Sequence, residues 1–295
     1  MLYLFFDIWQ QFMQGFGIVI CYAQGSQVLT ILVSCILSLA FLNNASAVSL
    51  IVQAVVGVIT TKKPKRKLDP QPTPINIVRK MTRKTVLGRQ LVWTNYDHLP
   101  LAMLLENNGS TVILRICCES NMVPQLSGGE LPDQYHLVEA CFKWGELRAE
   151  HSIDSVQFSL EMQVLHRCYQ DRVPFQHVSV SYLFLQMGGR NDPLTQITEN
   201  LRCVAHPDSK IELPAFDLAS LMNPFGSSFY SYTGTYDNGV QVVPTMWLIN
   251  THIFPISSEQ LSQFGALCGR DGNRIKCNAR QEQPLGNRSV HFNFI

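Results

Sequence analysis

Two stretches of the sequence decide the fold: His136-Leu-Val-Glu-Ala-Cys-Phe142 and Leu160-Glu-Met-Gln-Val-Leu165. Both are rich in the apolar, aromatic and β-branched residues that favour strands. Similar runs lie at Thr111–Cys117 and Val178–Met187, and clusters of Gly, Pro, Asn and Asp separate the runs. We therefore predict strands at all four places, and we place the start of the second quoted strand at Ser155.

The rest of the chain after residue 67 also favours a mainly β domain. Helical signals are limited to residues 193–203 and 257–267, and the second is opened by Ser257 or Ser258 with Glu259 in its first turn. We expect a single large, twisted, mostly antiparallel sheet of about ten strands, which is near the upper size of open sheets. Short helices should lie at its periphery.

Composition limits the classes of protein to which the chain can belong. Its 295 residues suffice for one large domain or two ordinary ones, and 23 Lys and Arg against 22 Asp and Glu give a net charge of +1. A nucleic-acid-binding protein would carry a basic patch or stripe, so no nucleic-acid partner is expected. Charged residues form 15% of the chain, against about 25% in an average soluble domain.

The deficit of charge lies in residues 1–61, where Asp7 is the one charged residue. This segment holds two apolar runs, Val28–Leu42 and Val48–Ile59. Neither reaches the roughly 20 residues of a membrane-spanning helix, but together they exceed that length. The small residues Ala45-Ser-Ala47 suit a signal-peptide cleavage site, although no positive residue precedes the apolar run. Residues 28–59 are interpreted as a secretory signal, a membrane anchor or a buried apolar hairpin.

A basic run, Lys62-Lys-Pro-Lys-Arg-Lys67, follows the apolar segment. Next to a membrane anchor, it would hold the following domain on the cytoplasmic side. We expect a membrane-associated protein or one in the secretory pathway, with a cytoplasmic location as the alternative. The predicted organisation is an apolar segment at 1–61, a basic linker at 62–69 and a folded domain at 70–295.

The nine cysteines leave the redox compartment open. The sequence contains no CxxC pair, so a zinc ribbon or a thioredoxin-like site has no support. Cys268 and Cys277 flank a turn-like stretch and suit a disulfide across a hairpin, whereas two free thiols are an equal alternative.

Short motifs follow one another along the domain: Thr73-Pro-Ile-Asn-Ile77, Asn95-Tyr-Asp97, Asn107-Asn-Gly109, Leu126-Ser-Gly-Gly129, Tyr135-His-Leu-Val138, Phe142-Lys-Trp-Gly145, Glu150-His-Ser-Ile-Asp154, Leu160–His166, Tyr232-Thr-Gly234, Trp247, Ile256-Ser-Ser-Glu-Gln260 and Gln283-Pro-Leu285. In this order they resemble the α-class carbonic anhydrases over about residues 70–295. One departure is that the basic linker stands where this family has a tryptophan-containing segment before the Pro-Ile-Asn motif.

The resemblance implies a zinc site whose ligands have changed. Carbonic anhydrases hydrate CO2 with a zinc-bound hydroxide, and three neutral imidazoles hold the metal. Two of these come from a His-x-His pair on one strand face, and the third comes from a neighbouring strand. The matching positions here are Cys141, Lys143 and Gln163. An ammonium group has no lone pair and an amide is a poor zinc ligand, so we expect no bound zinc and no other cofactor.

Other positions that the resemblance assigns to catalysis also differ. The threonine that orients the zinc hydroxide matches Asp237, and the next threonine matches Asn238. Tyr236 takes the place of a leucine beside the CO2 site. Ser110 stands at the position of the proton-shuttle histidine and cannot accept a proton near neutral pH as an imidazole can.

Two carboxylates that surround the metal site in the family persist here, as Glu150 and Glu161. Loss of zinc alone would leave them near Asp237 in a partly desolvated funnel, and an unpaired buried charge costs several kcal/mol. We expect Lys143 to replace the charge of the metal, within salt-bridge reach of at least one of these carboxylates. A sharper alternative is an uncharged Lys143 that acts as a nucleophile or base beside Cys141.

The resemblance therefore implies a catalytically inactive, carbonic anhydrase-related protein, a pseudoenzyme that binds a protein partner or serves as a structural module. The sequence does not identify the partner. One alternative is a carbonic anhydrase with full or residual activity. Another is a binder of small molecules or anions that uses the former funnel, with donors from Lys143, Gln163 and Asn238.

Overall fold

The computed structural model describes residues 71–145 and 148–295. The chain divides into two units between Lys65 and Arg66, and the described residues all belong to the second unit. The predicted apolar segment 1–61, its runs within residues 28–59 and the basic linker 62–69 lie outside the described residues. Among the described residues, no helix has both the length and the apolar character needed to cross a membrane.

Strands dominate the described part of the chain. They are β1 (Asn76–Ile77), β2 (Arg83–Val86), β3 (Leu91–Thr94), β4 (Ala102–Asn107), β5 (Val112–Cys117), β6 (Gln125–Gly128), β7 (Tyr135–Trp144), β8 (Ser152–Ile153), β9 (Leu160–Arg167), β10 (His177–Gln186), β11 (Lys210–Leu213), β12 (Phe229–Asp237), β13 (Val242–Ile256) and β14 (His291–Phe294). The helices are η1 (Arg79–Met81), α4 (Asp192–Thr198), η2 (Leu201–Val204), α5 (Leu218–Met222) and α6 (Ser258–Gly265).

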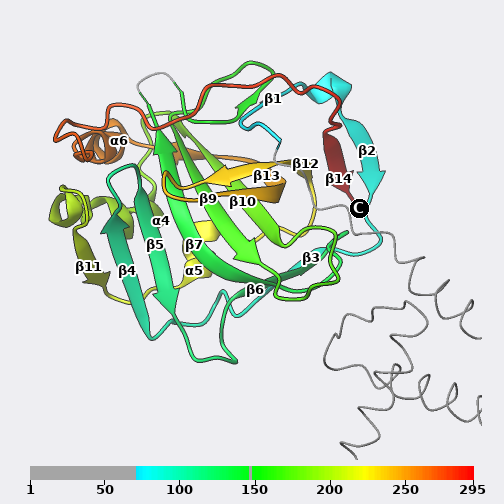
Figure 1. The fold of residues 1–295 in the computed structure, drawn as a ribbon, viewed down its shortest axis with the longest axis horizontal. Helices are drawn as coiled ribbons and strands as arrows, with labels where there is room; N and C mark the ends of the chain where they lie inside the picture. The colour runs from blue at the N-terminus through cyan, green and yellow to red at the C-terminus, as the bar shows by residue number, and fades with distance from the viewer. Residues whose placement is uncertain (1–70, 146–147) are drawn as a thin grey trace, which may run out of the picture. The chain divides into compact units, whose positions relative to one another are not determined.

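Twelve of these strands form one sheet, with helices α4, α5 and α6 outside it (Figure 1). The main path runs β11-β4-β5-β7-β9-β10-β13-β12-β14-β2. Outside this path, β6 pairs with β7, and β3 pairs with β6. Most neighbours are antiparallel, but β10–β13 and β14–β2 are parallel, as is the separate pair β1–β8. The predicted single, mostly antiparallel sheet with peripheral short helices is confirmed.

The central strands are covered on both faces. In β9 all residues but the last are buried, and in β10 the run from Val178 to Phe184 is buried. Because side chains alternate between faces, each strand serves two cores. One core contains Phe142, Met162 and their neighbours, and the other contains Cys141, Trp247 and theirs. The candidate site belongs to the second core.

Two predicted boundaries differ from the structure by more than two residues. The strand expected from Ser155 begins at Leu160, because Asp154 and Ser155 have φ values of 47° and 66° and form a turn. The helix expected over residues 193–203 ends at Thr198, and the short helix η2 follows it. The start of the other predicted helix is confirmed by a capping box in which the Ser257 side chain accepts the Gln260 backbone N–H.

The segment after α6 crosses one end of the sheet on its way to β14 (Figure 1). Its backbone is tied to β7 by the N–H of Asn278, which donates to the Trp144 carbonyl at 3.0 Å. Further along, the N–H of Gln283 donates to the Pro74 carbonyl at 2.8 Å. This segment therefore delivers side chains to the face that holds the candidate site. Cys268 and Cys277, at its start, are free thiols rather than a disulfide.

Candidate functional site

The candidate site lies on one sheet face, where β7 and β9 are neighbours. Their antiparallel register pairs Cys141 with Gln163 and Lys143 with Glu161. Because successive side chains of a strand alternate between faces, these four lie on the same face. The structure thus brings together the three positions that the sequence assigned to the zinc ligands.

A carboxylate and a guanidinium form the most tightly bonded pair of this site. Nε of Arg280 donates to Oε1 of Glu150 at 2.8 Å, and a terminal nitrogen donates to Oε2 at 2.7 Å. The backbone N–H of Arg280 also donates to Oε1, at 3.2 Å. The Glu150 side chain is fully buried and that of Arg280 is 21% exposed. The bidentate pair is therefore largely shielded from water, where such charge-assisted bonds are strong.

Lys143 supplies a second cation to the same carboxylate. Its ammonium nitrogen lies 3.8 Å from Oε1 of Glu150, and its side chain is 4% exposed. Between the two acidic groups, Nε2 of Gln163 donates to Glu150 at 2.8 Å and to Glu161 at 2.9 Å. Lys143 thus lies within salt-bridge reach of Glu150, as the sequence predicts.

Glu161 is held by several hydrogen-bond donors. Its Oε1 accepts from Nδ1 of His151 at 2.7 Å and from the hydroxyl of Ser181 at 2.8 Å. Its Oε2 accepts from the backbone N–H of His151 at 2.8 Å. The other ring nitrogen of His151 is hydrogen-bonded to the hydroxyl of Tyr232. Both ring nitrogens of this buried histidine are satisfied, so His151 has the structural role expected of a core histidine.

Two cations, Lys143 and Arg280, and two carboxylates, Glu150 and Glu161, make up this buried group. Burial alone would raise the pKa of Glu150, but the hydrogen bonds from Arg280 and the charge of Lys143 outweigh it and lower the pKa to about 2. The pKa of Glu161 is also lowered, because the interactions with His151 outweigh burial. Both carboxylates are therefore ionised at neutral pH.

A third carboxylate, Glu139, lies two residues before Cys141 on the same strand. Its Oε1 accepts the Tyr236 hydroxyl at 2.9 Å and the Asn238 side-chain amide at 2.6 Å. Its Oε2 accepts a guanidinium N–H of Arg115 at 3.0 Å. The ring of Tyr236 is completely buried. These bonds fix Tyr236 and Asn238 inside the core rather than leaving them free to bind a ligand.

The thiol of Cys141 faces this interior. Its Sγ lies 3.8 Å from the amide oxygen of Gln163. Burial raises the pKa of Cys141 to about 12, although the charge of Lys143 opposes the shift. The group is a protonated thiol at neutral pH, and the thiolate is the form that attacks electrophiles and binds metals.

Asp237 and Ser110 lie at the edge of the site, and the charge of Asp237 acts on Arg280 without a hydrogen bond or ion pair between them in the described residues. Asp237 is half-buried, and its Oδ1 accepts the backbone N–H of Gly239 at 2.7 Å, which shapes the turn after β12. That turn is pressed against Ser110, because a Cβ on Gly239 would lie 2.3 Å from the Ser110 Cβ. Of the three acidic residues considered as partners of Lys143, Glu150 is the one in salt-bridge reach.

The site is closed to solvent. Cys141, Gln163 and Tyr236 are 0% exposed and Lys143 is 3% exposed. A ligand that came from solvent would have to displace these side chains and break the bonds described above. The arrangement is chemically a filled and neutralised core, in which no nucleophile or free base faces an open space.

The donor set at Cys141, Lys143 and Gln163 does not fit a zinc ion. The Lys143 ammonium has no lone pair and an amide is a poor zinc ligand, and the Gln163 nitrogen already donates to two carboxylates. In the part of the chain that the structure describes, no three or more His, Cys, Asp or Glu side chains are grouped so as to hold a metal ion.

Sequence reasoning did not single out Glu139, Arg115 or Arg280. Glu139 could have been found, because it stands two residues before Cys141 and four before Lys143 in a strand, which places all three on one face. Arg115 and Arg280 carry no such signal. Arg280 in particular belongs to an irregular segment that is 130 residues away from Glu150 in sequence.

Comparison with known proteins agrees with this fold. Residues 62–294 match the family model described as eukaryotic-type carbonic anhydrase. The chain belongs to the carbonic anhydrase family. The matched range includes the 12-stranded sheet and every residue of the site described above.

Named members of the carbonic anhydrase family align over much of the chain. Carbonic anhydrase 15 of Mus musculus is 28% identical over 243 residues, which cover 75% of this chain and 74% of the relative. Carbonic anhydrase 1 of Oryctolagus cuniculus is 31% identical over 184 residues, which cover 57% of this chain and 77% of the relative. The mitochondrial carbonic anhydrase 5B of Homo sapiens is 27% identical over 202 residues, or 64% of this chain and 63% of the relative.

Proposed function

We propose that this member of the carbonic anhydrase family is catalytically inactive and acts as a protein-interaction or structural module. The observation that carries the proposal is the buried group of two cations, Lys143 and Arg280, and two carboxylates, Glu150 and Glu161, at the place where the family resemblance puts zinc. A fixed ammonium there supplies positive charge but offers no site for a hydroxide. Cys141, Lys143 and Gln163 are on this view remnants of the ligand positions.

The remaining pocket residues fit the same proposal. Tyr236 occupies space beside Cys141 and bonds to Glu139, while Asn238 bonds to the same carboxylate. Asp237 serves a turn, and Ser110 packs against Gly239. None of these four is arranged to orient a hydroxide, admit CO2 or relay a proton.

Two alternatives from the sequence are disfavoured by particular observations. Catalysis by Cys141 and Lys143 would need a thiolate or a free amine, but the pKa of Cys141 is raised and Lys143 lies beside an ionised carboxylate. Binding of a small molecule or an anion in the funnel would need access, but Gln163 and Tyr236 are completely buried.

Metal content and CO2 hydration of the purified protein test the proposal. We expect far less than one zinc per chain, even after incubation with excess zinc, and no hydration above the uncatalysed rate in stopped-flow measurements. Stoichiometric zinc together with hydration that a sulfonamide abolishes would overturn it. A family member with the intact three-histidine site, treated in parallel, shows that the incubation loads zinc.

We further propose membrane or secretory-pathway association through residues 28–59. The support is the apolar character of this segment and the basic run that follows it. Cell fractionation of the full chain, compared with a chain lacking residues 1–61, tests this localisation. Equal amounts of both in the soluble fraction would contradict it.

A further inference from the structure

A groove with unbalanced positive charge lies outside the buried site. It has a volume of about 580 Å³ and runs between the Gly109–Ser110 turn and the segment Gly269–Asn278. Three of its lining residues are basic, Arg270, Arg274 and Lys276, and one, Asp271, is acidic. The groove therefore combines a basic rim with backbone and amide groups.

Of these charged residues, Arg270 is neutralised by a carboxylate, and Asp271 is engaged in the hairpin turn but keeps its negative charge. Arg270 donates from its two terminal nitrogens to the two oxygens of Asp208, at 3.0 and 2.8 Å, and also donates to the Asn108 carbonyl. The carboxylate of Asp271 accepts both the backbone N–H and the side-chain amide of Asn273, each at 3.0 Å. Asp271 thus serves the hairpin turn.

Arg274 and Lys276 remain available for binding. Both are exposed, and neither forms an ion pair or a side-chain hydrogen bond with another residue in the described ranges. They flank Ile275, whose carbonyl accepts the indole N–H of Trp144 at 2.8 Å. Arg274 and Lys276 therefore lie on either side of a residue that is hydrogen-bonded to strand β7.

The segment that carries these cations is rigidly held. Gly269 donates to the Asn273 carbonyl at 2.8 Å, and Ile275 donates to the Leu267 carbonyl at 2.7 Å. Asn278 accepts the Trp144 N–H at 2.7 Å and donates to the carbonyls of Phe142 and Ser110. A surface held in this way loses little conformational entropy on binding, which favours affinity.

We infer that this groove binds an acidic segment of a partner protein, with Arg274 and Lys276 as the charged contacts. The inference deepens the proposed protein-interaction function and names its surface and the chemistry of the partner. The two exposed cations, Arg274 and Lys276, suit the Glu or Asp side chains of an extended peptide that lies along the groove.

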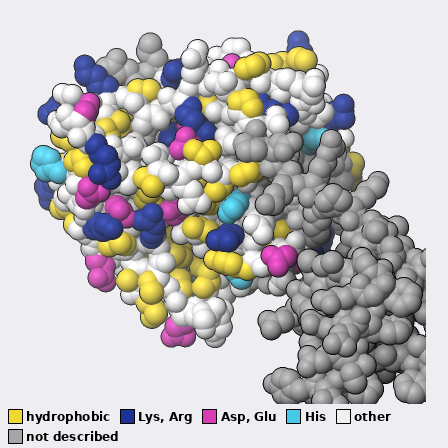
Figure 2. Space-filling view, in the orientation of Figure 1, with side chains coloured by type: hydrophobic (Ala, Val, Ile, Leu, Met, Phe, Trp, Pro, Cys, Tyr) yellow, Lys and Arg dark blue, Asp and Glu magenta, His cyan; other side chains and the backbone are white. Residues whose placement is uncertain are grey.

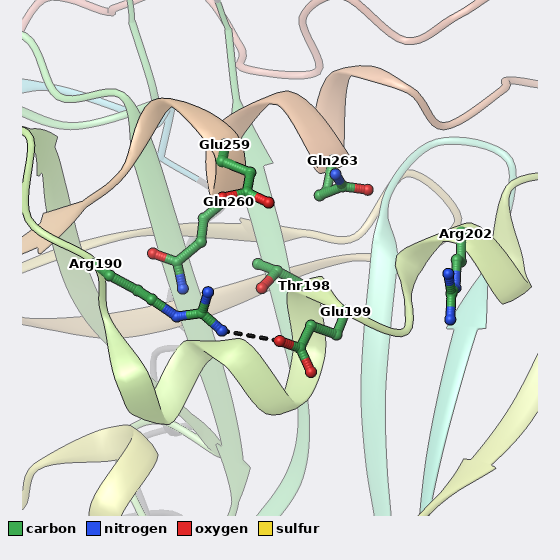
Figure 3. A pocket seen from close by; sticks show the side chains of 7 residues that line it. All are labelled: Arg190, Thr198, Glu199, Arg202, Glu259, Gln260 and Gln263. Carbon is green, nitrogen blue, oxygen red and sulfur yellow. Dashed lines mark hydrogen bonds and ion pairs between the residues drawn. The ribbon is translucent and has the colours of Figure 1, made fainter.

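Another hollow on the surface lacks this imbalance. It has a volume of about 310 Å³ and lies between α4 and α6 (Figure 3). Its two arginines, Arg190 and Arg202, are matched by Glu199 and Glu259, and Arg190 pairs with Glu199 at 2.8 Å. This hollow therefore offers no net charge for an acidic partner.

A nucleic acid is a poorer occupant of the basic groove. Affinity for a phosphate backbone comes from many contacts between basic side chains and phosphates. This groove has two unpaired basic side chains, Arg274 and Lys276, for such contacts. On the face drawn in Figure 2, Lys and Arg side chains are interspersed with Asp and Glu rather than joined into a basic stripe. A short acidic peptide needs no more than a local excess of charge.

Fluorescence anisotropy with a labelled peptide of alternating Glu, Asp and Gly tests the inference on the full chain. The matched peptide has Gln and Asn in place of the acids. We expect the acidic peptide to bind the wild type and the neutral one to bind at least about tenfold more weakly, which corresponds to the loss of about 1.4 kcal/mol. Binding should weaken as salt is added.

The decisive variant is Arg274→Glu with Lys276→Glu, and its control is Arg83→Glu with Lys84→Glu on the exposed edge strand β2. Both pairs change the net charge equally. We expect about a tenfold loss for the groove variant and less than about twofold for the control. The neutral variant Arg274→Gln with Lys276→Gln should fall in between, and thermal melting checks that all variants fold.

Three outcomes would overturn the inference: no binding of the acidic peptide, equal losses in the groove and control variants, or tighter binding of an oligonucleotide of equal charge. Zinc content and CO2 hydration are measured on the same samples. Activity there would contradict the inactive-protein proposal without affecting the peptide result, so the two failures are distinguishable.

Discussion

Arg280 and Glu150 form a bidentate pair, with donor–acceptor distances of 2.8 and 2.7 Å, although 130 residues separate them in sequence. Glu150 is fully buried, so its charge depends on cations that the fold brings to it. Lys143 is one of these and Arg280 is the other. The stability of the domain should therefore depend on both.

Replacing Arg280 with methionine should destabilise the domain strongly. Removing one partner of a buried ion pair costs about 3–5 kcal/mol, because the other charge stays buried and uncompensated. Unfolding in urea measures the change. Arg172→Met, at an exposed arginine, is the control and should change the free energy of unfolding by less than about 0.5 kcal/mol. Equal effects of the two substitutions would contradict a structural role for Arg280.

Replacing Lys143 with methionine tests the second cation while it largely keeps the side-chain volume. We expect a loss of about 3 kcal/mol, at the lower end for a broken buried pair because Arg280 still binds Glu150. The double variant Lys143→Met with Glu150→Gln should recover part of the loss, since their effects are coupled. Lys84→Met, on an exposed strand, is the control. A double variant no more stable than the additive sum would show that the two residues are not coupled.

Stability should fall in acid in two steps that separate variants can identify. The pKa of His166 is lowered by burial from 6.5 to about 4, so its contribution is complete above pH 6.5 and is lost as the pH falls towards 4. The pKa of Glu150 is lowered from 4.5 to about 2, so its contribution is lost between those values. Urea unfolding between pH 7 and pH 2 measures both. His166→Gln should reduce the first step, to which His136 and His177 also contribute, and Glu150→Gln should reduce the second, to which Glu161 also contributes. An unchanged second step in Glu150→Gln would refute this assignment.

Three substitutions should create a zinc site: Cys141→His, Lys143→His and Gln163→His. The register of β7 and β9 already places these positions on one face, so three imidazoles there have the spacing that zinc needs. We expect about one zinc per chain by metal analysis, whereas Cys141→His alone should bind none stoichiometrically. Hydration should still be absent until Asp237→Thr and a smaller residue at Tyr236 are added. Failure of the triple variant to bind zinc while folded would contradict the alignment of these positions.

The close contact between Gly239 and Ser110 predicts that a substitution at Gly239 destabilises the domain and that a second substitution at Ser110 reverses part of the loss. Gly239 has φ of 83°, so Gly239→Ala costs about 1–2 kcal/mol for the backbone alone, and the new Cβ would also meet Ser110. Gly188→Ala has a similar φ of 77° but open space, so it reports the backbone cost without the clash. Adding Ser110→Gly to Gly239→Ala should remove the clash and leave a loss similar to that of Gly188→Ala, because the nearest remaining atom is 3.7 Å away. No rescue in thermal melts would show that the turn moves instead.

The sequence predicts the sheet well because its signals are local. The strand-like runs around Cys141 and Gln163 and the capping residues Ser257 and Gln260 need no knowledge of distant contacts. The spacing of Cys141 and Lys143, together with the family resemblance, also places the centre of the site. Boundaries are harder to predict: the turn at Asp154 and Ser155 shortens β9, and its left-handed residues are neither glycine nor asparagine.

The partners of the buried charges could not be predicted in the same way. Asp237 and Glu150 are equally acidic in the sequence, but one serves a turn and the other meets Lys143 and Arg280. The choice is made by the C-terminal segment, whose path is set by backbone bonds such as that from Gln283 to Pro74. The residues next to Arg280 in the sequence form no pattern from which the path of this segment could be predicted.

The late position of Arg280 has a consequence for synthesis on the ribosome. Glu150 and Glu161 leave the exit tunnel long before the guanidinium that neutralises the first of them is made. Until then, a nascent chain that collapses around β7 and β9 buries an excess of negative charge, and β14 is still missing from between β12 and β2. A chain that ends before residue 280 therefore lacks both the guanidinium that binds the two oxygens of Glu150 and the strand that joins β12 to β2.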